Sequence, residues 1–530
     1  MLETALVYLP LSIIGFWRWS YWMVRIIGAS LYRPAPVVWP RNKKHLTLSV
    51  VTPVYNEEYG LFIQALESWI KNGADEIIAV IDKTNVHLIA DFESHYSQRK
   101  DVACRMIVTP KPGKRAALCD GIARASGGLI ALVDSDTVWG QDVAQKARPY
   151  FLNPKIGAVT VEQRIMNPNT TSNILFDILL WTRYREEVPF LLGLGKAFNT
   201  LSGRTAIYRR EAILNFRHDN LHSLRHESFL GVRAISGDDK RLTHLVLEQG
   251  WHIGFVKGAV VYTQGLNKLH TFLKQRTRWM RNSWRADLRA FKRGWVWKHP
   301  VLAFFNIDRF VQPFFMLLGP VVCTIAVLTR QWLVVILLVT WWLVSRTVRL
   351  FGYFRRYPAR LVYLPVYIIY TYYNAVAKIY ALATVLENSW VTRWHKDRLN
   401  RALLRQLAIT STGLVAVAAF ISLMFYFANS ISKATAAYID VPTAVSTPEF
   451  VLRTTAGAEA LANPKLPADA ILPTGITTYI AQPGDTLYEL AFRFNLPVNE
   501  LKRLNGITNI DKINEGQKVL YYSRLLGVQR

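Results

Sequence analysis

Hydrophobic positions follow two different patterns along the chain. Residues 3–28 and several stretches between 300 and 430 are long apolar runs. Between residues 46 and 300, short β-branched runs alternate with amphipathic stretches, as they do in a globular α/β domain. About 20 apolar residues are needed to cross a bilayer as a helix. The distribution therefore indicates an integral membrane protein that carries a globular insert.

The globular part has the pattern of a strand–helix alternation. Helices are expected at 60–71, 113–125 and 141–151. This alternation predicts an α/β fold, Rossmann-like, with a mostly parallel sheet whose ligand loops lie at the carboxyl ends of the strands. The predicted strands are 46–52, 76–82, 103–109, 129–134 and 156–163.

The apolar part divides into segments of different character. The segment 361–387 is rich in tyrosine and has Arg-rich flanks, so we expect it to be interfacial or re-entrant. The other predicted parts are a transmembrane anchor at 1–31, a globular domain at 46–265, amphipathic interface helices at 266–308, and a channel region at 309–428 with spans at 309–329, 331–350 and 406–428. A flexible linker at 429–475 and a compact module at 477–522 follow.

Charge adds information about partners. The chain has 64 Lys and Arg against 37 Asp and Glu, a formal net charge of +27. Many of the basic residues flank apolar segments, which is the pattern that the positive-inside rule selects, so a lipid bilayer is expected as a partner and nucleic acid is not. The three cysteines have no paired spacing, and they predict neither a disulfide framework nor a metal site of their own.

Two strand ends carry polar groups suited to a nucleoside. VTPVYNEE at 51–58 brings Tyr55 and Glu57 to the end of one predicted strand, and EIIAVID ends the next at Asp82. Each feature alone also fits a strand end with a helix cap. Together they predict a nucleoside pocket, because the carboxyl ends of neighbouring parallel strands lie side by side.

Charged residues follow at the next two elements. Lys114 and Arg115 enter a helix after Gly113, where cations and free amides suit a diphosphate. The run LIALVDSDTVW then places Asp134 and Asp136 on one side of an extended backbone. Two carboxylates on one side repel each other unless a cation holds them, so we expect Mg²⁺ or Mn²⁺ there.

Two further motifs provide candidate catalytic groups. SGDDKRLT places Asp238 and Asp239 in the first turn of a helix, where they either complement the helix dipole or provide a general base. In KQRTRWMRNSW, Gln275, Arg278 and Trp279 fall on one helical face. This face offers an amide, a cation for a leaving pyrophosphate, and a ring that can stack on a sugar. A membrane-surface helix has the same composition.

In this order, the motifs resemble those of the processive glycosyltransferases of family 2, and most closely the hyaluronan synthases, over roughly residues 46–428. SWVTR at 389–393 is similar to the gating loop of that group, with Val391 in place of its glycine. The resemblance implies a GT-A glycosyltransferase domain inserted between transmembrane helices, which uses a UDP-sugar to extend a β-linked polysaccharide with inversion and moves the chain across the membrane.

The resemblance also implies a role for each motif residue. Asp239 is the expected general base, beside Asp238, and Asp136 with Asp134 would ligate the metal. Gln275, Arg278 and Trp279 would border the acceptor. The UDP-sugar would contact Tyr55, Glu57, Asp82, Lys114, Arg115, Asp134, Trp390 and Arg393. The donor sugar stays open among N-acetylglucosamine, glucuronate and glucose.

The C-terminal module resembles LysM. YIAQPGDTLYELAFRFNLPVNELKRLNGI at 479–507 has the spacing of that β-α-α-β domain. The resemblance implies binding of peptidoglycan or another N-acetylglucosamine-containing glycan outside the cell membrane, with the catalytic domain in the cytoplasm. The glycan-binding candidates are Gly484, Asp485, Thr486 and Asn505.

Two other functions fit parts of the pattern. One is a non-processive transferase that loads a lipid-phosphate carrier, and the other is a glycan-binding wall-anchoring protein with an inactive transferase domain. The intact acids at 134, 136 and 239 argue against the second.

Overall fold

The computed structural model describes residues 2–35, 46–55, 57–110, 113–214, 220–229, 232–233 and 237–387, and then 476–482, 485–494, 496, 498–507, 514 and 516–522. The chain divides into two compact units, residues 1–440 and 441–530. The predicted span 406–428 and linker 429–475 lie outside the described residues, as do Trp390, Arg393 and Gly484.

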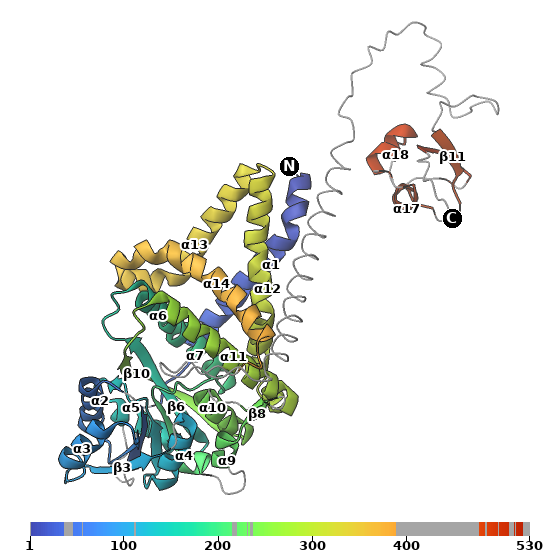
Figure 1. Ribbon diagram of the computed structural model, residues 1–530. Coiled ribbons are helices and arrows are strands. Elements are labelled where there is room, and N and C mark those ends of the chain that lie inside the picture. The colour runs from blue at the N-terminus through green and yellow to red at the C-terminus, as the bar shows by residue number, and fades with distance from the viewer. Residues whose placement is uncertain are drawn as a thin grey trace, which may run out of the picture. The chain divides into compact units, whose positions relative to one another are not determined.

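An eight-stranded sheet forms the centre of the first unit, in the order β3-β2-β1-β4-β7-β6-β10-β5 (Figure 1). β3, β2, β1 and β4 are parallel, and β6 is parallel to β10. β7 is antiparallel to both its neighbours, and β5 is antiparallel to β10. The mostly parallel sheet is confirmed. Its strands are β1 (Leu48–Val54), β2 (Glu76–Asp82), β3 (Ala103–Thr109), β4 (Leu129–Leu132), β5 (Thr137–Trp139), β6 (Ile156–Ile165), β7 (Ala206–Arg209) and β10 (His252–Thr263).

The central strands are buried on both faces. Val51 and Ile78 belong to one hydrophobic core, and their neighbours Val50 and Ile77 belong to the other. Successive side chains of a strand point to opposite faces, which is why these strands are continuous apolar runs in the sequence. All five predicted strands are present. β10 was not predicted, because its register shifts between Val256 and Val260 and interrupts the alternation.

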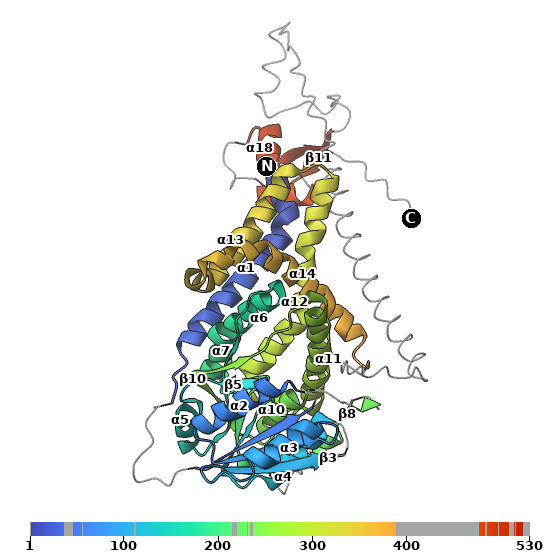
Figure 2. The same ribbon diagram turned by 60° about the vertical axis from the view of Figure 1, so that its left-hand side comes forward.

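Helices cover the two faces of the sheet (Figures 1 and 2). The predicted helices at 60–71 and 113–125 are confirmed as α2 and α4. The one at 141–151 is shorter than predicted, because α5 passes into a 3₁₀ turn at Arg148–Leu152 that contains Pro149. The bounds are α2 (Tyr59–Lys71), α3 (Val86–His95), α4 (Lys114–Arg124), α5 (Val143–Ala147), α6 (Thr171–Thr182), α7 (Val188–Gly195), α8 (Arg210–Ile213), α9 (Asn220–Arg225) and α10 (Asp238–Glu248).

Five long helices are also present among the described residues of this unit. They are α1 (Leu2–Ser30), α11 (Leu269–Arg293), α12 (Pro300–Leu328), α13 (Trp332–Arg356) and α14 (Leu364–Ala383). Among the described residues, α12 and α13 are long and apolar enough to cross a membrane. α12 begins well before the predicted span at 309–329. The segment expected to be interfacial forms α14, which crosses α12 and α13 obliquely near the catalytic domain (Figures 1 and 2).

The contact between α1 and α7 depends on two glycines. A Cβ atom added to Gly193 would lie 2.7 Å from the carbonyl oxygen of Gly28, and one added to Gly28 would lie 2.7 Å from the Phe190 ring. At Gly193 the two backbones therefore approach so closely that a side chain does not fit, whereas a Cβ atom at Gly28 would meet side chains of α7. Arg25 of α1 also pairs with Glu186 at 3.8 Å.

The second unit has the predicted β-α-α-β order. Its elements are β11 (Ile476–Ile480), α17 (Leu487–Arg493), α18 (Val498–Leu504) and β12 (Lys518–Tyr522), and the two strands pair antiparallel. Leu487, Leu490, Leu501 and Val519 form its core.

Candidate active site

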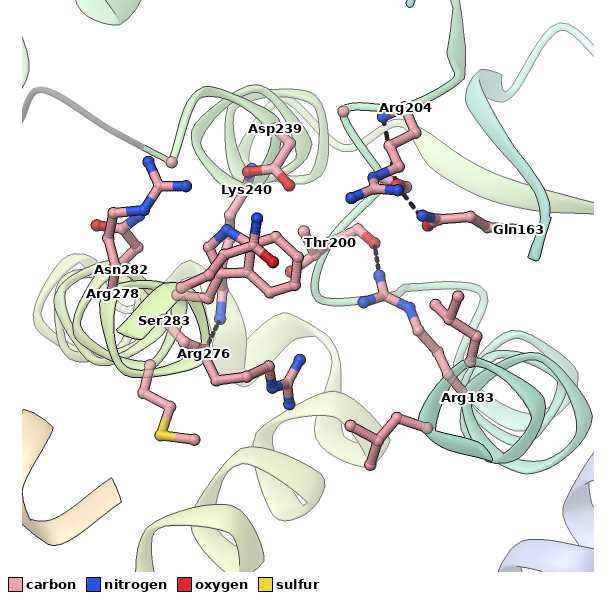
Figure 3. A pocket seen from close by; sticks show the side chains of 18 of the residues that line it. Gln163, Arg183, Thr200, Arg204, Asp239, Lys240, Arg276, Arg278, Asn282 and Ser283 are labelled. Carbon is pink, nitrogen blue, oxygen red and sulfur yellow. Dashed lines mark hydrogen bonds between the residues drawn. The ribbon is translucent and has the colours of Figure 1, made fainter. Parts of the chain in front are cut away.

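A cavity of about 530 Å³ lies where the sheet meets the long helices. Its walls come from the loop after β4, the first turns of α4 and α10, the segment 200–204, and helices α11, α12 and α14. Figure 3 shows Arg183, Arg204 and Asp239 approaching it from different elements. The predicted site residues that line it are Lys114, Asp134, Asp136, Asp238, Asp239, Gln275, Arg278 and Trp279.

Lys114 connects the carboxylates of two elements. Its Nζ lies 2.6 Å from Asp134 Oδ1 and 3.3 Å from Asp238 Oδ2. Burial lowers the pKa of Lys114, but the charges of Asp134 and Asp238 outweigh it, and the pKa lies above its ordinary value. The ammonium group therefore stays protonated and holds the end of β4 beside the start of α10.

Asp238 and Asp239 are neighbours with opposite pKa shifts. Burial alone would raise the pKa of Asp238, but Lys114 and Arg115 hold it below its usual range. Burial and the charge of Asp238 raise the pKa of Asp239, whose Oδ1 accepts a hydrogen bond from the Lys240 amide at 2.7 Å. The opposite pKa shifts make Asp238 an ion-paired carboxylate and Asp239 a more basic one. The role of Asp239 as the proton acceptor stays a prediction.

Asp134 and Asp136 are the predicted ligands of a divalent cation. Burial, and then the nearby charge of Asp136, raise the pKa of Asp134 against the effect of Lys114, so the two carboxylates repel each other. Both line the cavity, and their oxygens are of the kind that Mg²⁺ and Mn²⁺ prefer. No three His, Cys, Asp or Glu side chains among the described residues are grouped to hold a metal. The pair therefore fits a cation that takes its remaining ligands from substrate and water.

Helix α11 presents the predicted amide, cation and ring to the cavity. Burial lowers the pKa of Arg278, against the charges of Asp238, Asp239 and Asp134. The Trp279 ring lies 5.8 Å from Phe176 and is covered by Arg276, whose guanidinium carbon is 5.6 Å from the ring centre. Gln275 Oε1 is buried and has no hydrogen-bond partner among the described residues. A buried oxygen without a hydrogen-bond partner can accept a hydrogen bond from a hydroxyl of a ligand.

Some of the predicted residues do not line this cavity. Arg115 pairs with Glu227 at 2.6 Å and donates to the Leu224 carbonyl, whereas Asp82 accepts from the Thr84 amide and hydroxyl at the end of β2. Tyr55 is exposed and Glu57 is half-buried. Their roles toward a nucleotide stay predictions.

The predicted LysM residues have local contacts. Asp485 accepts from Tyr479 Oη at 2.9 Å and from the Gln482 amide at 2.8 Å, ahead of α17, where Thr486 follows it. Asn505 exchanges hydrogen bonds with the backbone of Leu520 and donates to the Leu501 carbonyl. These contacts stabilise the module, and glycan binding by these residues stays a prediction.

Several cations of the cavity were not predicted. Arg183 lies in a π-helical turn and donates to the Thr200 carbonyl at 2.6 Å, while Arg204 lies over the Phe176 ring. Arg309 and Lys378 come from α12 and α14. Lys378 could have been predicted from its position, because a charged residue inside an apolar, tyrosine-rich helix usually faces a cavity or a partner.

Two family models and several known proteins match parts of this chain. Residues 45–282 match the family model described as glycosyltransferase-like family 2, and residues 479–520 match the LysM domain. A type 2 glycosyltransferase of Zymoseptoria tritici is 24% identical over 418 residues, which are 74% of this chain and 87% of the relative. An N-acetylglucosaminyltransferase of Azorhizobium caulinodans is 30% identical over 253 residues, 46% of this chain and 62% of the relative.

Among solved structures, a mannosyltransferase from Pyrobaculum calidifontis in complex with GDP-Man and Mn²⁺ aligns with a TM-score of 0.45 at 17% identity, covering 70% of this chain and 97% of that one. Residues 45–282 match a family 2 glycosyltransferase domain, and their sheet and helices form an α/β, GT-A-like fold. The protein is a glycosyltransferase that also contains a C-terminal LysM domain. The particular resemblance to hyaluronan synthases stays a prediction.

Proposed function

We propose that this protein is a membrane-embedded, inverting and processive glycosyltransferase that builds a β-linked polysaccharide from a UDP-sugar. The observation that supports it best is the meeting of Lys114, Asp134, Asp239 and Arg278 in one cavity. Because one relative is named an N-acetylglucosaminyltransferase, UDP-N-acetylglucosamine is the first donor to consider.

The residues of the cavity suggest a single displacement. The Asp239 carboxylate takes the proton of an acceptor hydroxyl, and the oxygen forms a bond to the anomeric carbon of the donor. The bond from that carbon to the diphosphate breaks, and its electron pair leaves with UDP. Arg278 and Lys114 are the cations that offset the leaving charge. A Mg²⁺ or Mn²⁺ ion held by Asp134 and Asp136 would supply further positive charge for the diphosphate.

The walls of the cavity support processive synthesis. Catalytic carboxylates lie on α10 and after β4, whereas Arg309 and Lys378 come from helices α12 and α14. A bound saccharide can therefore extend from the reacting centre toward the long helices without leaving the cavity. Trp279 gives its sugars an aromatic surface, and Gln275 gives them a hydrogen-bond acceptor.

The test is turnover by the purified full-length protein with a panel of UDP-sugars. We expect UDP release with UDP-N-acetylglucosamine, alone or with a second UDP-sugar, and a ladder of products in mass spectrometry. A product with a single added sugar would contradict processivity. Absence of UDP release with every donor would instead favour a glycan-binding protein with an inactive catalytic domain.

We also propose that the catalytic domain is cytoplasmic and that the LysM domain binds peptidoglycan or the product glycan outside the cell membrane. Two exposed positions allow a topology test, Thr477 on β11 and Lys100 in the catalytic domain. In intact cells, an impermeant thiol reagent should label a Thr477→Cys variant and leave a Lys100→Cys variant unlabelled until the cells are lysed. The reverse pattern would exclude this arrangement.

A further inference from the structure

Three cations from helices α11, α12 and α14 line the cavity, and we refer to Arg276, Arg309 and Lys378 as the membrane-side cluster, because α12 is long and apolar enough to cross a membrane. Arg276 donates to Tyr370 Oη at 3.2 Å, and Arg309 donates to Ser283 Oγ at 3.3 Å. Within the described parts of the chain, none of the three has a carboxylate within ion-pair distance. Their charges are thus directed at the cavity without a fixed counterion.

The cluster is electrostatically unfavourable when the cavity holds only water. Burial, followed by the charges of Arg309 and Arg276, lowers the pKa of Lys378 to about 7, although Glu187 and Asp308 act in the opposite direction. Asp308 is itself paired with Arg18. Among the described lining residues, Glu187 is therefore the acid left on this side, facing three cations. An anion bound here would relieve their repulsion.

The cluster is distinct from the cations that serve the donor. The charges acting on Arg278 are those of Asp238, Asp239 and Asp134, and Lys114 contacts two of these acids directly. The charges acting on Lys378 come instead from Arg309, Arg276, Glu187 and Asp308. The cavity thus has a donor end, where Lys114 and Arg278 face the carboxylates of Asp134, Asp238 and Asp239, and a membrane-side end, where the cluster faces Glu187.

We propose that the membrane-side cluster is an anion-binding subsite that selects an acidic acceptor, one with an oxyanion close to the sugar that receives the transfer. The shared chemistry is a carboxylate or a phosphate: the carboxylate of a hexuronic acid residue, or the phosphate of a lipid-linked acceptor. This inference rests on the proposed transferase function, and it adds a charge requirement that a neutral homopolymer does not meet. Gln275 Oε1, buried without a partner in the described structure, is placed to accept from a hydroxyl of the same acceptor.

The experiment uses the full-length protein in nanodiscs and measures acceptor binding directly, without a donor. The probes are two matched pairs: an oligosaccharide ending in hexuronic acid against the same compound reduced to the neutral hexose, and a sugar linked to a polyprenyl phosphate against the same sugar linked to the corresponding alcohol. The variants are Lys378→Met, which keeps the length of the side chain, and Lys378→Arg, which keeps the charge. Lys274→Met is the control, because Lys274 is an exposed residue of α11 that does not line the cavity.

We expect the wild type to bind one acidic probe at least about tenfold more tightly than its neutral partner, since hydrogen bonds to charged groups are among the strong ones. Lys378→Met should lose most of that preference and leave the Kd for UDP unchanged, whereas Lys378→Arg and Lys274→Met should retain it. A preference within the oligosaccharide pair identifies the oxyanion as the carboxylate of a hexuronic acid, and a preference within the lipid pair identifies it as a lipid-linked phosphate. Equal binding of acidic and neutral probes by the wild type would overturn the proposal, and so would weaker UDP binding in Lys378→Met.

Failure of the proposed function gives a different result. If no UDP-sugar is turned over but the charge preference and its loss in Lys378→Met remain, the subsite stands and the transferase reaction does not. If UDP is released normally but the wild type binds acidic and neutral probes equally, the transferase function stands and the anion-binding subsite does not.

Discussion

An Asp239→Asn variant is expected to transfer sugar about 10²–10⁴-fold more slowly than the wild type, with little change in the Kd for UDP. The amide cannot accept the proton of the acceptor hydroxyl, and it keeps nearly the same volume. Turnover is measured as UDP release under saturating donor, and binding as the Kd for UDP by titration calorimetry. Elongation near the wild-type rate would exclude Asp239 as the general base.

The matched control is Glu248→Gln, the same change of acid to amide on the same helix. Glu248 pairs with Arg293 on the surface, away from the cavity, and its loss should alter turnover little.

The pH profile provides an independent test of Asp239. Burial and the neighbouring charge of Asp238 raise its pKa, so its reactive carboxylate is present above that raised pKa and is lost as the pH falls through it. The acidic limb of kcat/KM should therefore lie at higher pH than an ordinary aspartate, whose pKa is 3.8, would give. A limb at the ordinary value would assign the titration to another group.

Removal of divalent cations is expected to abolish turnover, and Mg²⁺ or Mn²⁺ should restore it. An Asp136→Asn variant should lose about 10²-fold or more even with excess metal, because charge neutralisation by a metal contributes several kcal/mol to such reactions. The measurements are UDP release across a metal titration and Mn²⁺ binding by electron paramagnetic resonance in the presence of UDP. Full turnover in excess chelator would show that the carboxylates act without a metal.

Asp142→Asn is the control for this change. Asp142 is an exposed acid close in sequence, in a left-handed conformation with φ of 60°, which asparagine tolerates well. It does not line the cavity, and its variant should keep both metal dependence and rate.

Much of the fold was predictable because burial on both faces of the sheet makes β1, β2 and β4 continuous apolar runs. The groups at the ends of strands and helices, Lys114, Asp134 and Asp239, were predictable for a similar reason, since topology alone brings such ends together.

Side-chain direction on a helix was not predictable in the same way. Lys114 and Arg115 are adjacent, but successive residues of a helix point about 100° apart, and only the first reaches the cavity while the second pairs with Glu227. Lys378 was not predicted to line the cavity, because its direction depends on how two helices pack. Whether one charge on α14 faces the cavity depends on how that helix crosses α12, a tertiary property that periodicity does not contain.

The glycine contact between α1 and α7 has a mechanical consequence. Where two backbones touch without intervening side chains, the helices cannot roll or slide past each other by changing rotamers. The N-terminal helix and α7 should then move as one rigid unit. A catalytic domain tied in this way to the N-terminal helix cannot follow a lengthening product, so in a processive cycle the saccharide is the part that has to advance, one sugar for each bond formed.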